Sequence, residues 1–137
     1  RRECGKTGLE LDATASHVLR HMPSAAKCVV RADSSRPESI SYLKRHGLQK
    51  IVGVKKGKGS VEDGVEFIKS FDKVVIHPDC ENVADEFRLY SYKTDRLSGD
   101  ILPILIDANN HWIDAIRYAL EPIMRNKFNK DKFGAVL

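Results

Sequence analysis

The chain has 137 residues, of which 42% are hydrophobic and 31% charged, a composition typical of one globular domain with its own core. No apolar run approaches the roughly 20 residues of a transmembrane helix, and no secretory signal pattern precedes the domain, which excludes a membrane-spanning or secreted class. Lys and Arg number 23 against 19 Asp and Glu, and this net charge of +4 is compatible with a polyanionic partner.

Helix and strand patterns alternate along the chain, which favours an α/β fold. Apolar residues at helical spacing indicate the helices, and short β-branched runs indicate the strands. The elements expected first are helix 9–22, strand 27–33, helix 37–47, strand 50–56 and a helix from residue 60. The elements expected next are strand 73–76, helix 81–90, a β-hairpin over 92–106 and a last helix from residue 109 or 110 to about residue 122.

Three helix starts carry specific predictions. Pro37 suits the first position of its helix, where a missing N–H costs nothing. Ser60 with an aspartate three residues later resembles a capping box, and Asn109 or Asn110 is expected to cap the last helix. Residues 123–137 form a basic C-terminal tail, with four cations between residues 124 and 137 against one aspartate, and we expect it to be a solvated end.

Two carboxylates stand where such a fold brings distant segments together. Asp33 lies at the carboxyl end of a buried strand, the edge at which open α/β sheets bind ligands. Asp114 lies in the first turn of the last helix, His111 shares its face, and Asp107 lies just before the helix. Carboxylates that converge need a cation, and all-oxygen sites suit magnesium or manganese, which support phosphoryl transfer.

Structural roles for the same acids stay open at this point. Asp33 precedes a Ser-Ser-Arg-Pro turn and fits a turn-capping residue. Asp114 fits a partner of the helix dipole.

The loop over residues 55–59 is a candidate nucleic-acid contact. Lys55, Lys56 and Lys58 stand on a glycine-rich backbone and can hold phosphates as point charges, and Arg36 extends this basic surface. A solvated loop without a ligand is the alternative.

Three other motifs are too incomplete to define a site. Gly5-Lys6-Thr7 resembles the end of a phosphate-binding loop but lacks its earlier glycine and strand. His17 and His21 share a helix face without a third ligand, and His77 with Cys80 is half a zinc site. The three cysteines are widely spaced, which indicates a reducing compartment and no disulfide framework.

Six segments occur in an order that is informative as a whole. They are Ala32-Asp33-Ser34-Ser35-Arg36-Pro37-Glu38-Ser39-Ile40, Val54-Lys55-Lys56, Ser60-Val61-Glu62-Asp63-Gly64, Val75-Ile76-His77-Pro78, Glu86-Phe87-Arg88-Leu89-Tyr90-Ser91-Tyr92 and residues 107–120. Together they resemble the C-terminal nuclease domain of the phage terminase large subunit, over residues 3 to 122.

The resemblance implies a ribonuclease H-like mixed sheet flanked by helices, with a β-hairpin added around residues 95–100. It implies a metal-dependent endonuclease that cuts concatemeric phage DNA by two-metal phosphodiester hydrolysis, with magnesium or manganese. Asp33 matches the family's second acid, Asp114 its helix acid and His111 the neighbouring histidine, and Asp107 is a candidate additional acid. The implied partners are double-stranded DNA, the terminase small subunit and the portal protein, in the host cytoplasm and without a membrane.

The sequence departs from the family upstream of Asp33. The family's first acid lies on a central strand there, whereas Asp12, in a predicted helix, is the one aspartate before Asp33. Because the chain also begins with Arg rather than Met, we expect the first strands to be missing and residues 1–122 to be a partial nuclease domain. We therefore expect little or no cleavage by this chain alone.

Three other functions remain open. Another ribonuclease H-like enzyme, such as a transposase or junction resolvase, would share the acid arrangement. A non-catalytic basic module that docks on DNA or on the portal would share the positive charge, and a phosphate-loop ATPase is the weakest alternative.

Overall fold

The computed structural model describes residues 3–133 of the chain and combines helices with two small sheets. The helices are α1 (Leu11–His21), the 3-10 turn η1 (Pro23–Ala26), α2 (Pro37–Arg45), α3 (Ser60–Lys69), α4 (Glu81–Leu89) and α5 (His111–Phe133). The strands are β1 (Val30–Ala32), β2 (Ile51–Gly53), β3 (Tyr92–Thr94) and β4 (Ile101–Leu105). The expected order of elements is thus present, with the exceptions described below.

A parallel pair of strands organises the N-terminal half. β1 pairs with β2 in a register that sets Ala32 opposite Gly53. Helices α1 and α2 cover this pair, and Pro37 starts α2 as expected. The buried residues of the resulting core come from α1, η1, the loop before β2 and β2 itself: Ala15, Ala25, Leu48 and Ile51.

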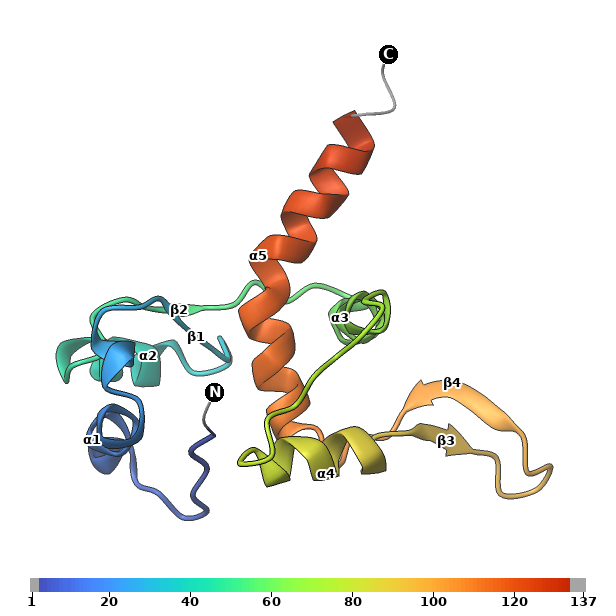
Figure 1. Cartoon of the computed structure of the whole chain (residues 1–137), viewed down its shortest axis with the longest axis horizontal. Coiled ribbons are helices and arrows are strands. Elements are labelled where there is room, and N and C mark those ends of the chain that lie inside the picture. The colour runs from blue at the N-terminus through green and yellow to red at the C-terminus, as the bar shows by residue number, and fades with distance from the viewer. Residues whose placement is uncertain (1–2, 134–137) are drawn as a thin grey trace.

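Helix α5 connects the two halves of the molecule. It runs through the centre of the structure, with β1, β2, α1 and α2 to one side and α3, α4 and the hairpin to the other (Figure 1). It packs against β1, α3 and α4, and Ile113 in its first turn is buried together with Val65 and Ile68 of α3. Its first turns lie against α3 and α4, and its middle, around Tyr118 and Glu121, contacts β1 and the residue that follows it.

The predicted β-hairpin forms an arm that projects from this body (Figure 1). β3 and β4 are antiparallel, with a register shift between Tyr92 and Thr94. Leu97 at the turn is 99% exposed and Ile101 is 76% exposed, so the arm buries little apolar surface of its own.

The strand predicted over residues 73–76 is wrong: this segment is extended, but no strand pairs with it among residues 3–133. The β-branched residues that predicted it are instead accessible, with Val74 46% and Val75 76% exposed. They line a groove of about 710 Å³ whose other walls come from α3, α4 and α5. A β-rich sequence makes a strand only where a neighbouring backbone accepts its hydrogen bonds, and none lies beside it in the described chain.

The last helix continues beyond its predicted end at Pro122. Pro122 lies inside α5, which extends to Phe133. A proline removes one intrahelical N–H and does not by itself stop the backbone, so the predicted end of the helix at Pro122 is wrong. Residues 134–137 of the predicted tail lie outside the described residues, and the boundary between a domain over 1–122 and a tail over 123–137 stays a prediction.

The capping box predicted at Ser60 is also wrong. Gly59 is the N-cap of α3, with a positive φ of 78°, and Ser60 is already the first helical residue. The N–H of Asp63 bonds to the Gly59 carbonyl at 2.9 Å. Glycine at this position permits the left-handed backbone that joins the lysine loop to α3.

None of the helices in the described part of the chain is both long and apolar enough to cross a membrane.

The core around the parallel strands yields a stability prediction. Leu48 is 2% exposed, and Leu48→Ala should lower the free energy of unfolding by about 2–5 kcal/mol because it leaves a cavity. Leu97→Ala makes the same chemical change at a side chain that is 99% exposed and should stay within about 0.5 kcal/mol of the wild type. Urea unfolding followed by circular dichroism measures both. Equal effects of the two variants would contradict this placement of the core.

Candidate functional site

Asp33 is held at the carboxyl end of β1 by its own turn and by two distant side chains. Its Oδ1 accepts hydrogen bonds from the Ser35 N–H at 2.7 Å and the Ser35 hydroxyl at 2.5 Å. Its Oδ2 accepts from Lys56 Nζ at 2.5 Å and from the Tyr118 hydroxyl at 3.1 Å. Asp33 thus caps its own turn, which is the structural role that the sequence left open for it. It also contacts Lys56 in the loop after β2 and Tyr118 of α5.

The parallel pairing of β1 and β2 explains why Lys56 reaches Asp33. The carboxyl ends of parallel strands lie at one edge of the sheet. At this edge the Val54 N–H, just after β2, donates to the carbonyl of Ala32, the last residue of β1, at 2.9 Å. Hydrogen bonds from Lys56 and Ser35 hold the pKa of Asp33 far below its usual range. The hydrogen bond to Asp33 likewise raises the pKa of Lys56, so both groups are charged at neutral pH.

Asp114 is paired with a buried arginine one turn further along α5. Oδ1 of Asp114 accepts from Nε and NH2 of Arg117 at 3.1 and 2.6 Å, and NH1 of Arg117 donates to the Ser60 carbonyl at 3.0 Å. The Arg117 side chain is 5% exposed and that of Asp114 is 28% exposed. The pair therefore joins α5 to the start of α3 and leaves part of the Asp114 carboxylate open to solvent.

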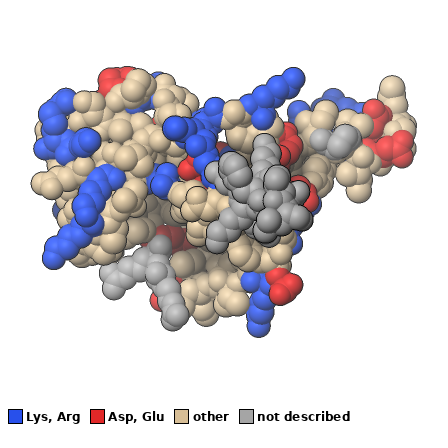
Figure 2. Space-filling model, turned by 90° about the horizontal axis from the view of Figure 1, so that it is seen from above, with Lys and Arg blue, Asp and Glu red and all other residues tan. Residues whose placement is uncertain are grey.

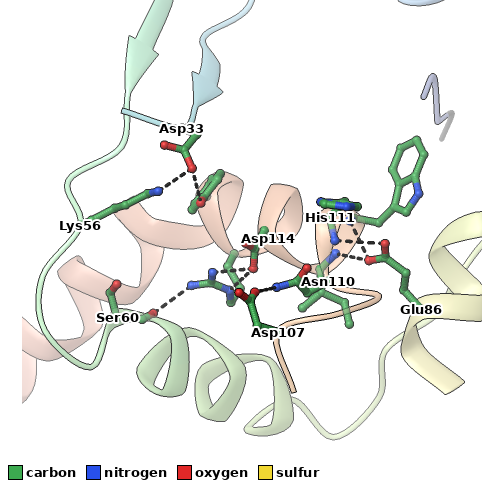
Figure 3. Close-up of polar contacts among 12 residues, drawn as sticks. Asp33, Lys56, Ser60, Glu86, Asp107, Asn110, His111 and Asp114 are labelled. Carbon is green, nitrogen blue, oxygen red and sulfur yellow. Dashed lines mark hydrogen bonds and ion pairs between the residues drawn. The ribbon is translucent and has the colours of Figure 1, made fainter. Parts of the chain in front are cut away.

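Tyr118 contacts Asp33 and lies one helical turn after Asp114 on α5. Its hydroxyl touches Asp33, and burial together with the charges of Asp114 and Asp33 raises its pKa. Nζ of Lys56 and the guanidinium carbon of Arg117 each lie 5.5 Å from its ring centroid. Figure 3 shows Asp33 with Lys56 at the end of the strands and Asp114 on α5. The convergence of Asp33 and Asp114 on one cation stays a prediction.

Asp107 and His111 lie at the start of α5, as expected from their positions. Oδ1 of Asp107 accepts from the Asn110 amide at 3.0 Å, and the side chains of Asp107 and His111 are exposed. Burial raises the pKa of Tyr90, and the charges of Asp114 and, more weakly, Asp107 act in the same direction. Figure 3 shows Asp107 beside Asn110 at the start of α5.

Glu86 of α4, which the sequence patterns did not single out, caps the helix that carries these residues. Its Oε1 accepts from the His111 N–H at 3.0 Å, and its Oε2 accepts from the N–H groups of Trp112 at 2.7 Å and Ile113 at 3.1 Å. The cap predicted from Asn109 or Asn110 is thus supplied by Glu86, which lies 25 residues before His111, and the Asn110 amide donates to Asp107 instead. No local pattern reveals such a cap, because it depends on how α4 packs against α5.

A basic groove adjoins the acids. It has a volume of about 190 Å³ and lies between the lysine loop, the start of α3 and one face of α5. The cations that line it are Lys55, Lys56, Lys58, Arg117 and Arg125. Figure 2 shows Lys and Arg side chains over the left-hand and central parts of this view, with several acidic side chains on the hairpin arm at the right. Arg36 is exposed at the N-cap of α2, close in sequence to Asp33.

The carboxylates of Asp33 and Asp114 are the type of ligand that a hard divalent cation prefers, but there are too few of them to hold one alone. Carboxylate oxygens suit magnesium and manganese, which keep several waters or substrate oxygens as their other ligands. Within residues 3–133, however, no three His, Cys, Asp or Glu side chains gather closely enough to hold an ion, and Lys56 and Arg117 already neutralise the two acids. Asp33 and Asp114 could hold a cation only together with further ligands.

The decoy motifs do not form sites in the described structure. His17 and His21 stack with ring centroids 4.4 Å apart, and Nδ1 of His21 contacts the His17 carbonyl, which is an intrahelical arrangement. Nδ1 of His77 accepts from the Asp79 N–H at 3.2 Å, and Cys80 is buried.

A helical, partly parallel α/β domain with acids at the carboxyl edge of its strands is the class of structure that phosphoryl-transfer nucleases use. The sequence model described as "Terminase RNAseH like domain" matches residues 10–122, and the chain belongs to this family. The ribonuclease H-like fold and the resemblance to the large terminase subunit predicted from the sequence are thereby confirmed.

Three similar proteins agree with this assignment. The large terminase subunit of Bacillus phage SPP1 is 43% identical over 119 residues, which are 85% of this chain and 28% of that protein. The PBSX phage terminase large subunit of Bacillus subtilis (strain 168) is 32% identical over 93 residues, 68% of this chain and 21% of that protein. The crystal structure of the SPP1 g2p (large terminase) nuclease domain with bound Mn matches with a TM-score of 0.74 and 42% identity, over 84% of this chain and 64% of that one.

The chain spans less than a third of the length of the SPP1 and PBSX large terminase subunits. It spans less than two thirds of the solved SPP1 nuclease domain.

The packing of Arg117 against α3 yields a prediction for Gly64. A Cβ at this position would lie 2.8 Å from Cδ of Arg117, a side chain that cannot move aside because it is buried and bonded to Asp114 and Ser60. The clash costs about 1–3 kcal/mol and outweighs the gain in helix propensity of about 1 kcal/mol. Gly64→Ala should therefore destabilise the protein in urea unfolding.

Glu62→Ala is the matched control, because Glu62 is exposed on the same helix. It should change the free energy of unfolding by less than about 0.5 kcal/mol. A more stable Gly64→Ala variant would show that Arg117 is not held as described.

Proposed function

We propose that this chain is part of the DNA endonuclease of a phage terminase large subunit, and that Asp33 and Asp114 are two of its metal-binding acids. The observation that carries the proposal is the hydrogen bond from the Tyr118 hydroxyl to Asp33, which ties the end of β1 to the helix turn that follows Asp114. The relative solved as a nuclease domain with bound Mn supports a divalent cation. The substrate is double-stranded phage DNA in concatemeric form.

In this proposal each residue near the acids has a distinct role. Asp33 and Asp114 bind magnesium or manganese, His111 assists as a ligand or as a proton donor to the leaving oxygen, and Asp107 is an additional acid at the same helix start. Two bound ions would supply activated water and neutralise charge on the phosphate during hydrolysis. Tyr118 orients Asp33 through its hydroxyl.

The counter-ions Lys56 and Arg117 predict weak cation binding by this chain alone. A divalent cation competes with Lys56 for Asp33 and with Arg117 for Asp114. Like-charged acids without such partners would repel one another, so the two cations stabilise the acids when no metal is bound. Further ligands from outside these residues are then needed for tight binding, which accords with little cleavage by the isolated chain.

The basic groove supports binding of the DNA backbone without sequence readout. Lys55, Lys56 and Lys58 border the groove next to the acids, and Arg36 extends the positive surface. Cations that contact phosphates position a duplex, whereas sequence is read at base edges. As a terminase component, the protein would work in the host cytoplasm with the small subunit and the portal protein.

A second candidate function is a non-catalytic module that docks on DNA. The observation that favours it is that both acids are already paired with cations, while no complete metal-binding group is present in the described residues. DNA binding that needs no metal, together with no cleavage in the complete large subunit, would support this alternative.

The catalytic proposal predicts the effect of one substitution in a complete large subunit that carries this chain. Asp33→Ala should lower metal-dependent cleavage of long linear duplex by more than about 100-fold, since even outer-shell changes at metal sites cost 10–100-fold. The fold should persist, because Asp33 is exposed and surface ion pairs contribute at most about 1 kcal/mol.

Asp12→Ala is the control, because it removes an exposed carboxylate of α1 that is outside the site. It should leave cleavage unchanged, and EDTA should abolish cleavage by the wild type. Full magnesium-dependent cleavage by Asp33→Ala would reject the assignment.

The groove predicts a salt dependence of DNA binding. Each phosphate contact contributes about 0.9 to the slope of log K against log salt concentration for duplex DNA. The double variant Lys55→Ala/Lys58→Ala should therefore reduce this slope by about 1–2 in fluorescence anisotropy titrations.

The double variant Lys27→Ala/Lys50→Ala removes the same charge at the opposite, amino-terminal edge of β1 and β2 and should keep the wild-type slope. Equal slopes for the two double variants would show that the groove is not the DNA contact.

A further inference from the structure

Glu86 is a buried carboxylate whose described contacts are backbone N–H groups of another helix. It is 8% exposed, and both of its oxygens are engaged by the first residues of α5. Asp33 and Asp114 each have a cation partner, whereas Glu86 is neutralised by three peptide dipoles at a helix N-terminus. This placement differs from that of an ordinary surface glutamate of an amphipathic helix.

We propose that Glu86 is the positioning residue of the metal centre, an inference that rests on the function proposed above. The first N–H groups of a helix have no intrahelical acceptor, so the first turn frays unless side chains or water satisfy them. Glu86 satisfies the N–H groups of His111, Trp112 and Ile113. The next residue is Asp114, whose own N–H bonds to the Asn110 carbonyl at 2.7 Å. Glu86 thereby sets the backbone from which His111 and Asp114 project.

Because Glu86 belongs to α4, the order of the first turn of α5 depends on α4 as well as on α5 itself. A local Asn or Ser cap would let the first turn of α5 form independently of its surroundings. With Glu86 as acceptor, that turn is ordered only when α4 lies against it (Figure 3). Burial makes the loss costly, since each orphaned donor costs about 1–3 kcal/mol.

Glu3 caps α4 in the same manner and offers a matched control. Its carboxylate accepts from the N–H groups of Asn82 at 3.0 Å and Val83 at 3.1 Å, and from the Asn82 amide at 2.6 Å. Glu3→Gln therefore weakens a helix cap by the same chemical change as Glu86→Gln, but at a helix that carries none of the proposed ligands.

The test measures Mn²⁺ binding by the complete large subunit that carries this chain, from the electron paramagnetic resonance signal of free Mn²⁺. Binding that is present in the wild type and lost in Asp33→Ala defines the site. Glu86→Gln should weaken this binding about tenfold, the lower end of what outer-shell changes cost. It should also speed amide hydrogen exchange at His111, Trp112 and Ile113, with circular dichroism unchanged.

Glu3→Gln should keep the Mn²⁺ affinity within twofold of the wild type and speed exchange at Asn82 and Val83 only. If Glu86→Gln does not fold, Glu86→Asp, which keeps the charge but is one methylene shorter, should show a several-fold loss of affinity.

Two outcomes overturn the inference alone: wild-type Mn²⁺ affinity in the folded Glu86 variant, or an equal loss in Glu3→Gln. Equal Mn²⁺ binding by the wild type and Asp33→Ala overturns the proposed metal centre, and the inference with it.

Discussion

The packing of α5 across the edge of the parallel strands decides where the acids of this domain stand. β1 and β2 direct Asp33 and Lys56 to one edge because parallel strands end on the same side. α5 packs on β1, and its Tyr118, one turn after Asp114, reaches Asp33 at that edge, while Arg117 bonds to Ser60 of α3. Without this contact Asp33 would be a turn residue and Asp114 an ordinary helix-start acid.

Charge neutralisation is arranged differently for each buried or crowded carboxylate. Lys56 pairs with Asp33 at a partly exposed position, where a competing cation can reach the oxygens. Arg117 pairs with Asp114 from a buried position that is also bonded to Ser60, so this pair holds α3 and α5 together. Glu86 has peptide N–H groups as donors. Removing one partner of a buried ion pair such as Asp114–Arg117 usually costs more stability than the pair contributes, because the remaining charge is left without compensation.

An apolar groove of about 710 Å³ runs along residues 73–78, and neither Asp33 nor Asp114 is among the residues that line it. Val74, Val75 and Phe71 are exposed along it, although their side chains are of the kind that normally lie in a core. This chain corresponds to only part of its solved relative, at 64% coverage. The described residues therefore combine the fold of the family with apolar surface that they leave uncovered.

Several features were predictable because they depend on neighbouring residues alone. The helices from α1 to α4, the strands of the parallel pair and the hairpin follow from periodicity, and Pro37 begins α2 as its missing N–H allows. The positions of Asp33 after β1 and of Asp114 in the first turn of α5 follow from the same local patterns. The motif order that resembles the terminase nuclease domain is also written in the sequence.

Other features depend on contacts between distant segments, and local patterns do not contain them. Residues 73–76 have the composition of a strand but have no pairing partner in the described chain, and α5 continues through Pro122. The cap of α5 comes from Glu86 rather than from Asn109 or Asn110, and Arg117 is buried where it bonds to the Ser60 carbonyl of α3. The sequence by itself determined which residues could meet, because spacing sets the face of a helix and the end of a strand. Only the tertiary structure decided which of them do, because hydrogen bonds and ion pairs form between groups that packing brings within reach.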